Sequence, residues 1–236
     1  MTELQEDKEL SLEEHLAELR VRVIKILIAL AFSTSIVFFY SQDLIRSFWK
    51  TFFGSEEIYV YSPIEWIITR LLVSLLISLI VVYPYAIYEF YLFAKPGLYE
   101  NERKFLKTLL IPSYLVFLLG FFIAYKLVIP ILYKISYSSL AYPYFSAEKT
   151  LQNAFKILIA FGFSFQIPLA MLIAEKLKLV DYKTLKDYRL LIYLFVFILV
   201  MNSISDLSFI TQISILVLFI VMYELGLLLL RIEKGL

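Results

Sequence analysis

The stretch PIEWIITRLLVSLLISLIVVYPYAIYEFYLF (residues 63–93) decides the fold class of this chain. It is predominantly apolar and longer than the roughly 20 residues that an α-helix needs to cross a bilayer. Its apolar residues run on continuously, whereas the strands of a membrane β-barrel alternate apolar and polar residues in segments of about ten. Backbone groups in lipid must be satisfied within their own segment or barrel. The stretch therefore predicts a transmembrane helix, with spare length for tilt or protrusion.

The whole chain has the composition of a protein whose solvent is lipid. Of its 236 residues, 61% are apolar and only 18% are charged, and the mean hydropathy is +0.81. Soluble domains carry roughly 45–50% apolar and about 25% charged residues. The interior of a water-soluble fold of this size is too small to bury that many apolar side chains. The net charge of +1 gives no global steering toward nucleic acid.

Six apolar segments predict an all-α, polytopic membrane protein with six transmembrane helices. They cover residues 23–40, 63–93, 108–132, 151–177, 190–203 and 209–230. The fifth and sixth are short and are joined by only a few residues, which predicts a tight hairpin that thins the bilayer locally. We predict a single integral membrane domain over residues 1–236, composed of a cytoplasmic amphipathic lead-in (1–22), the six-span bundle (23–230) and a cytoplasmic tail (231–236).

The positive charges predict an orientation. Fifteen of the 22 Lys and Arg residues fall on one face of the predicted bundle and seven on the other. The richer face is expected to be cytoplasmic, which places both termini inside. Two aromatic-rich loops, residues 41–62 and 133–150, are then expected to face outward.

The N-terminal segment has its own pattern. Ser11 and Glu14 form a capping-box pair, which predicts that a helix begins near Ser11. Glu14, Glu18 and Arg22 follow at i, i+4 spacing on one face of that helix. Two interpretations are open: an amphipathic lead-in that lies on the membrane with solvated charges, or a cytoplasmic binding surface marked by Glu18 and Arg20.

The segment FAKPGLYENER (residues 93–103) forms a second predicted cytoplasmic feature. Pro96 and Gly97 indicate a turn, and Glu102 opens the next helix. The helix dipole stabilises a carboxylate in a first turn, which is a purely structural role for Glu102. A functional role requires a second carboxylate nearby, and Glu18 lies on the same predicted face of the membrane.

Gln166 lies in the fourth predicted span, in the stretch FSFQIP (residues 163–168). Polar residues inside spans are costly and are candidates for function. Pro168 clashes with the carbonyl of Ser164, which predicts a kink. Gln166 either bonds the freed backbone or faces a polar cavity.

Several of these motifs, taken in order, resemble the TatC family. HLAELRVR (15–22) resembles its H-L-x-E-L-R-x-R signature, and residues 93–103 resemble its F-x-x-P-x-L-x-x-x-E-R loop. Gly120 with Ala124, Tyr125 and Pro130 resembles its third-span pattern. GFSFQIP (162–168) resembles its G-x-x-F-E-x-P pattern, and YELG (223–226) resembles the end of its sixth span. The resemblance covers nearly the whole chain.

The sequence also departs from that family's pattern. Gln166 stands where the family often has glutamate, so a titrating carboxylate is not required at this position. Ser203 to Asp206 matches the family's T-P-x-D without the proline. A proline that commonly follows the first span has no counterpart near Phe48.

The resemblance implies the receptor subunit of the twin-arginine translocase, which binds twin-arginine signal peptides of folded cargo at the cytoplasmic face of the cell inner membrane. It implies export driven by the proton-motive force with TatB-like and TatA-like single-span partners, several copies per complex, and no cofactor or metal. The implied signal-peptide residues are Glu18, Glu102, Arg20, Phe93, Pro96, Leu98 and Arg103. The implied intramembrane polar or partner contacts are Gln166, Met201, Asp206 and Gln212.

Two other classes of function fit the sequence less well. A six-span secondary transporter or channel is the alternative, but mid-membrane charge is sparse and no internal repeat is evident. An intramembrane enzyme would need a nucleophile with its base, or metal ligands. The chain has a single histidine, His15, no cysteine and no Walker loop, so no enzymatic activity is expected.

Overall fold

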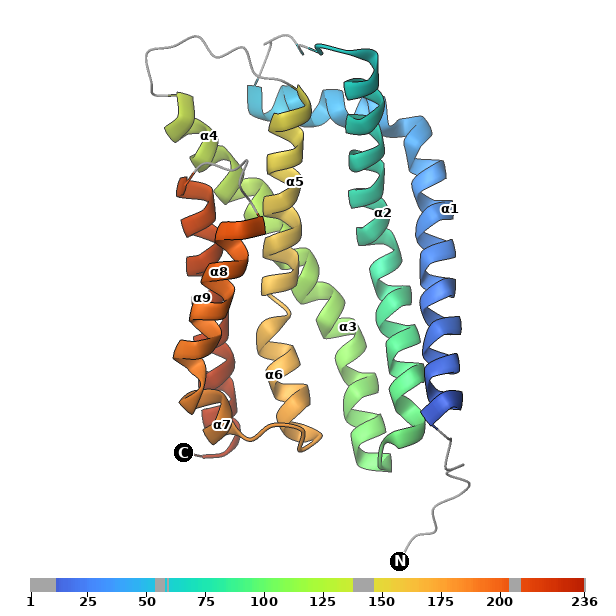
Figure 1. Ribbon diagram of the computed structural model, residues 1–236, viewed down its shortest axis with the longest axis vertical. Coiled ribbons are helices and arrows are strands. Elements are labelled where there is room, and N and C mark those ends of the chain that lie inside the picture. The colour runs from blue at the N-terminus through green and yellow to red at the C-terminus, as the bar shows by residue number, and fades with distance from the viewer. Residues whose placement is uncertain (1–11, 54–57, 59, 138–146, 204–208, 236) are drawn as a thin grey trace, which may run out of the picture. The chain divides into compact units, whose positions relative to one another are not determined.

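The computed structural model describes residues 12–53, 58, 60–137, 147–203 and 209–235, and within them the regular structure is entirely helical (Figure 1). The helices in chain order are α1 (Leu12–Phe53), α2 (Pro63–Ala94), the 3₁₀ turn η1 (Lys95–Gly97), α3 (Glu100–Ile123), the π-helical turn η2 (Ala124–Val128), α4 (Ile129–Tyr137), α5 (Ala147–Ser164), α6 (Ile167–Lys176), α7 (Tyr182–Asp187), α8 (Arg189–Ser203) and α9 (Phe209–Glu233).

Among the described residues, five helical segments are long and apolar enough to cross a membrane. They are Glu13–Phe52, Pro63–Gly97, Glu100–Ile135, Glu148–Lys176 and Thr211–Glu233, and Arg189–Asn202 is a shorter apolar helix. The prediction of an all-α polytopic membrane protein is confirmed. The fifth predicted span is short, as expected, because α8 has 15 residues. The sixth is not short: α9 has 25 residues because its leucine-rich end stays helical to Glu233.

Helix α1 is much longer than the predicted first span. It has 42 residues and runs unbroken from Leu12, so the predicted lead-in is, from residue 12 onward, the first part of the same helix. A helix start near Ser11 is consistent with this, although Ser11 itself lies outside the described residues. The predicted outer loop 41–62 is helical as far as Phe53. Ile45 and Trp49 are buried while Arg46 and Lys50 are exposed, so this end of α1 is an amphipathic helix.

The kink predicted at Pro168 is a break between two helices. Helix α5 ends at Ser164 and α6 begins at Ile167, with Gln166 directly before α6. The Gln166 amide donates to the Phe163 carbonyl at 2.9 Å, a tight turn in place of the regular α-helical bond. Pro is well tolerated in the first turn of a helix, where its missing N–H would have no helical partner. The two halves of the fourth span are seen as α5 and α6 in Figure 1.

The described chain divides into two compact units. Among the described residues, the first comprises 12–44 and 70–114, and the second comprises 45–53, 58, 60–69, 115–137, 147–203 and 209–235. In the first unit, α1 and α2 pack through polar contacts. The Arg70 side chain donates to the Ser41 hydroxyl at 2.9 Å and to the Phe38 carbonyl at 3.0 Å, and it lies over the Phe38 ring. Helix α2 contacts α3 through Tyr83, whose hydroxyl lies 3.2 Å from that of Ser113.

The second unit contains the end of α1, the start of α2, the second part of α3 and the helices that follow it. Gly120 of α3 lies against α5 so closely that a Cβ at this position would meet the Phe161 carbonyl oxygen at 2.7 Å. Gly226 of α9 similarly faces Met171 and Pro168 of α6. Small residues let helix backbones approach closely in membranes, where no hydrophobic force draws helices together.

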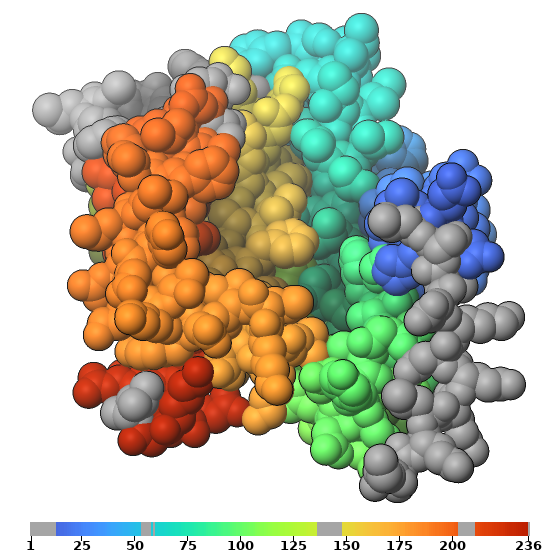
Figure 2. All heavy atoms as spheres, turned by 60° about the horizontal axis from the view of Figure 1, so that its bottom comes forward, coloured from blue at the N-terminus to red at the C-terminus, as the bar shows by residue number. Residues whose placement is uncertain are grey.

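The C-terminal end of α9 is held to the end of α6 by two crossed ion pairs. The Lys176 ammonium lies 2.9 Å from Glu233, and that of Lys234 lies 2.6 Å from Glu175. The hydrogen bond with Glu175 raises the pKa of Lys234 above its ordinary value. In Figure 2 the end of α9 (red) lies against the segment around α7 (orange). Helix α8 contacts α9 there through the Tyr193 hydroxyl, which donates to Glu224 at 2.7 Å.

Candidate functional site

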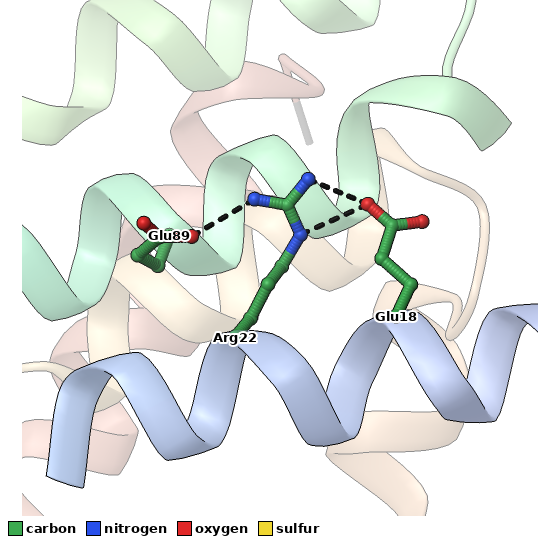
Figure 3. A network of polar contacts seen from close by, with 3 residues as sticks. All are labelled: Glu18, Arg22 and Glu89. Carbon is green, nitrogen blue, oxygen red and sulfur yellow. Dashed lines mark hydrogen bonds and ion pairs between the residues drawn. The ribbon is translucent and has the colours of Figure 1, made fainter. Parts of the chain in front are cut away.

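The candidate site lies in the first unit and is organised around Arg22 (Figure 3). Arg22 donates through Nε and Nη2 to one oxygen of Glu18, at 2.9 and 2.5 Å. Its third nitrogen, Nη1, donates to Oε2 of Glu89 on α2 at 2.9 Å. The guanidinium therefore bridges a carboxylate on its own helix and one on α2.

This bridge explains how the charged side chains of Arg22 and Glu89 can be largely buried between α1 and α2. The side chain of Glu89 is only 6% exposed, and that of Arg22 is 18% exposed. An isolated buried charge is costly, whereas a charge that is paired and hydrogen-bonded is tolerated. One guanidinium is therefore shared by two carboxylates.

A second contact between the same helices involves a predicted site residue. The Phe93 ring stacks on His15, with the ring centroids 4.3 Å apart and an interplanar angle of 22°. His15, Glu18 and Arg22 share one face of α1, because their spacing of three and four residues is that of helical neighbours. Glu89 and Phe93 are likewise one turn apart on α2. The face of α1 that carries Glu18 is therefore the face that packs on α2.

The loop from η1 to α3 orders the second predicted carboxylate. Oε2 of Glu102 accepts a hydrogen bond from the Tyr99 amide at 3.0 Å, which satisfies a backbone donor directly before α3. The side chain of Arg103 turns back and donates to the Pro96 carbonyl at 3.3 Å. The Leu98 amide closes η1 on the Lys95 carbonyl. The structure thus gives Glu102 a capping hydrogen bond at the start of α3, whereas the sequence pattern predicts a structural role only through the helix dipole.

Each of the two predicted carboxylates has one oxygen that accepts no hydrogen bond from the described residues. Glu18 is bonded through Oε1 and Glu102 through Oε2, and no other described residue donates a hydrogen bond to the second oxygen of either. In Figure 3 the second oxygen of Glu18 points away from Arg22. An ionised carboxylate has about four acceptor positions, so both groups retain capacity for a further donor.

The remaining predicted residues fall into two groups. Phe93, Pro96, Leu98 and Arg103 belong to the α2–η1–α3 segment with Glu102, while Arg20 is exposed on α1. Gln166, Met201 and Gln212 belong to the second unit instead. Gln166 is half-buried at the α5–α6 break, Met201 is half-buried near the end of α8, and Gln212 is buried in α9. Asp206 lies outside the described residues.

Sequence reasoning missed Glu89 as a member of the site, and it treated Arg22 only as a charge on a helical face. The detectable signal was an acidic residue in an otherwise apolar span, four residues before Phe93 and therefore on the same face of α2. Among the described residues, no cluster of three or more His, Cys, Asp or Glu side chains could hold a metal ion.

Comparison with known proteins gives a consistent family. The family described as "Sec-independent protein translocase protein (TatC)" matches residues 14–221. A protein named Sec-independent protein translocase protein TatC from Methanocella arvoryzae is 30% identical over 95% of this chain and 95% of its own. The protein of the same name from Aquifex aeolicus is 27% identical over 91% of this chain and 92% of its own.

A solved structure agrees in both fold and sequence. The crystal structure of a twin-arginine translocase receptor, TatC, superposes on this chain with a TM-score of 0.82 and 26% identity, covering 94% of this chain and all of that one. A second TatC structure, in the detergent DDM, gives a TM-score of 0.81. The chain therefore belongs to the TatC family, and it is a multi-pass membrane protein and a core subunit of the twin-arginine translocase, where it acts with other Tat subunits and not as an enzyme.

Proposed function

We propose that this chain is the subunit that receives the twin-arginine signal peptide, and that Glu18 and Glu102 accept its two guanidinium groups. The observation that carries the proposal is that each carboxylate is held in place through one oxygen while its other oxygen has no donor among the described residues. Ordered acceptors with remaining capacity are what a cationic ligand needs.

The chemistry of the pair favours arginine over lysine. Arginine presents a planar fork of five N–H donors, whereas lysine presents a compact and strongly hydrated ammonium. One oxygen of each carboxylate is already hydrogen-bonded, so the direction of the other oxygen is fixed. Such an acceptor favours binding of a planar donor group of matching geometry.

The other predicted residues have supporting roles. Phe93, stacked on His15, offers an aromatic edge beside Glu18. Pro96 and Leu98 form the turn that brings the chain to Glu102, and Arg103 braces that turn through the Pro96 carbonyl. Arg20 is exposed on α1, where it is available to polar groups of the peptide.

We infer that this face is cytoplasmic in the cell inner membrane and that both termini are inside. The support is the excess of Lys and Arg on this face and the even number of spans, counting the short α8 as one. On this basis TatB-like and TatA-like single-span proteins are the expected partners, in a complex with several copies of this chain, driven by the proton-motive force. Gln166, Met201, Asp206 and Gln212 are the proposed intramembrane contacts with those partners.

Photo-crosslinking tests the receptor proposal directly. A photoreactive residue replaces Asn101, which is exposed and adjoins Glu102, so that both carboxylates remain in place. A twin-arginine peptide is expected to crosslink and a twin-lysine peptide to crosslink poorly. Glu18→Ala and Glu102→Ala should each reduce crosslinking at least about tenfold, because hydrogen bonds to charged groups contribute roughly 1.5–3 kcal/mol.

Glu100→Ala is the matched control. Glu100 lies two residues from Glu102, but its side chain is 78% exposed and pairs with Lys104. Crosslinking should be retained in this variant. Equal crosslinking in all three variants would contradict the proposed acceptors, and equal crosslinking of the two peptides would contradict arginine selectivity.

A further inference from the structure

A pocket in the second unit has no part in the proposed receptor function. It has a volume of about 220 Å³ and lies where the last turn of α1 meets η2 and α4. Its lining residues are Thr51, Phe52, Tyr125, Lys126, Pro130, Tyr133 and Lys134. Helix α4 is labelled in Figure 1.

The wall of the pocket is a set of interlocked aromatic rings. Phe52 packs edge-on against Tyr125, with centroids 5.0 Å apart, and against Tyr133 at 6.3 Å. The Tyr133 hydroxyl donates to the Thr150 carbonyl at 2.9 Å, which fixes that ring to α5. Trp49, only 4% exposed, packs behind Phe52 and Tyr133. These contacts join the rings of the wall to one another and to α5.

Two lysines line the pocket together with this wall. Lys126 lies in the π-helical turn η2, a distortion that is frequent at functional sites, and its ammonium lies 5.4 Å from the centre of the Tyr125 ring. Lys134 follows in α4. In the part of the chain that the structure describes, neither lysine forms an ion pair with a carboxylate. The pocket consequently carries two positive charges, which favour binding of an anion.

The pocket lies at the level of a membrane surface. Thr51 and Phe52 are at the end of the candidate span Glu13–Phe52, and Tyr133 and Lys134 are at the end of the candidate span Glu100–Ile135. Tyrosine side chains and snorkelling lysines are typical of the headgroup region. The same helical segment also exposes a stripe of apolar side chains, which comprises Leu119, Phe122, Leu127 and Ile131.

We propose that this pocket binds the phosphate headgroup of an anionic phospholipid, with the acyl chains lying along the exposed stripe. Lys126 and Lys134 pair with the phosphate, and the aromatic wall packs against the glycerol. A free phosphate would use the lysines but leave the apolar stripe without a function. A choline headgroup suits an aromatic cage, but the two ammonium groups repel its quaternary nitrogen.

Native mass spectrometry of the full-length protein in mild detergent tests the site. The protein is exchanged into equimolar phosphatidylglycerol and phosphatidylcholine, and the retained lipid is counted. We expect preferential retention of phosphatidylglycerol. Lys126→Gln and Lys134→Gln should each reduce that preference about fivefold, as expected from the contribution of one lysine near an anionic surface. The double variant should lose it.

Two controls separate the charge effect from a folding defect. Lys50→Gln removes a lysine from the same end of α1 that does not line the pocket, and it should keep the preference. The double variant with arginine at positions 126 and 134 preserves the charge and should also keep it. A double glutamine variant that retains phosphatidylglycerol like the wild type would overturn the proposal. Displacement of the lipid by millimolar inorganic phosphate would overturn it in favour of a free-anion site.

Discussion

Glu18 and Arg22 are joined through a single carboxylate oxygen, because both hydrogen bonds from the guanidinium end on Oε1. The third bond of Arg22 crosses to Glu89, 67 residues away in sequence. Arg22 therefore neutralises a buried acid and at the same time turns the free oxygen of Glu18 away from itself (Figure 3). The stability of the first unit and the geometry of the candidate receptor site depend on the same guanidinium.

Replacement of Arg22 should destabilise the protein. Arg22→Ala leaves Glu89 buried without its cation, and removal of one partner from a buried pair costs about 3–5 kcal/mol. The expected result is a lower thermal unfolding midpoint in detergent. Glu89→Gln in the same background should recover part of the loss, because a neutral amide is cheaper to bury than a carboxylate. A midpoint unchanged in Arg22→Ala would show that the bridge carries little of the stability.

The capping role of Glu102 can be distinguished experimentally from the role of its negative charge. Glu102→Gln keeps an oxygen that can accept from the Tyr99 amide but removes the negative charge. Its unfolding midpoint should stay near that of the wild type, while binding of a twin-arginine peptide should weaken. Glu102→Ala should lose both, with a stability cost of about 1 kcal/mol for the cap. Peptide binding at wild-type strength in Glu102→Gln would mean that the carboxylate acts only as a cap.

The contact between α3 and α5 should not accept a methyl group. In Gly120→Ala the new Cβ would lie 2.7 Å from the Phe161 carbonyl oxygen, which is backbone and cannot swing aside. Overpacking of this kind costs about 1–3 kcal/mol. Gly97→Ala is the control, since no atom lies within 4 Å of the corresponding Cβ. Thermal unfolding of the two variants side by side measures the difference, and equal midpoints would contradict the close packing.

The pair of Lys234 and Glu175 predicts a dependence on alkaline pH. The hydrogen bond with Glu175 raises the pKa of Lys234, so the folded state holds this proton more tightly than the unfolded state. Its stabilising effect is fully present below the ordinary lysine pKa of 10.5 and is lost as pH rises through the higher folded value. Lys234→Gln should therefore lower the unfolding midpoint equally at pH 7 and pH 9, and its midpoint should approach that of the wild type only above about pH 11. A difference that already vanishes by pH 9 would exclude this pair as the source.

Local patterns in the sequence were sufficient for much of the fold. Continuous apolar runs predict membrane helices because a span needs only length and hydropathy. The break at Gln166 was predictable because the effect of Pro168 extends only over the preceding turn. The continuation of α1 to Phe53 was not predicted, because residues 41–62 were expected to form an aromatic-rich outer loop, and the burial of Ile45 and Trp49 comes from tertiary packing.

The amino-acid sequence alone was enough to predict that lipid is the solvent of this protein, where most of its membrane helices lie, and that Glu18 and Glu102 are candidate acids at one predicted face. Only the tertiary structure decided that Glu89 is the partner of Arg22, which oxygen of each acid is occupied, and that Lys126 and Lys134 share an aromatic pocket. The difference arises from the distance along the chain over which each effect acts. Hydropathy and helical periodicity act over a few turns, whereas a hydrogen-bond partner 67 residues away depends on the register in which α1 packs against α2.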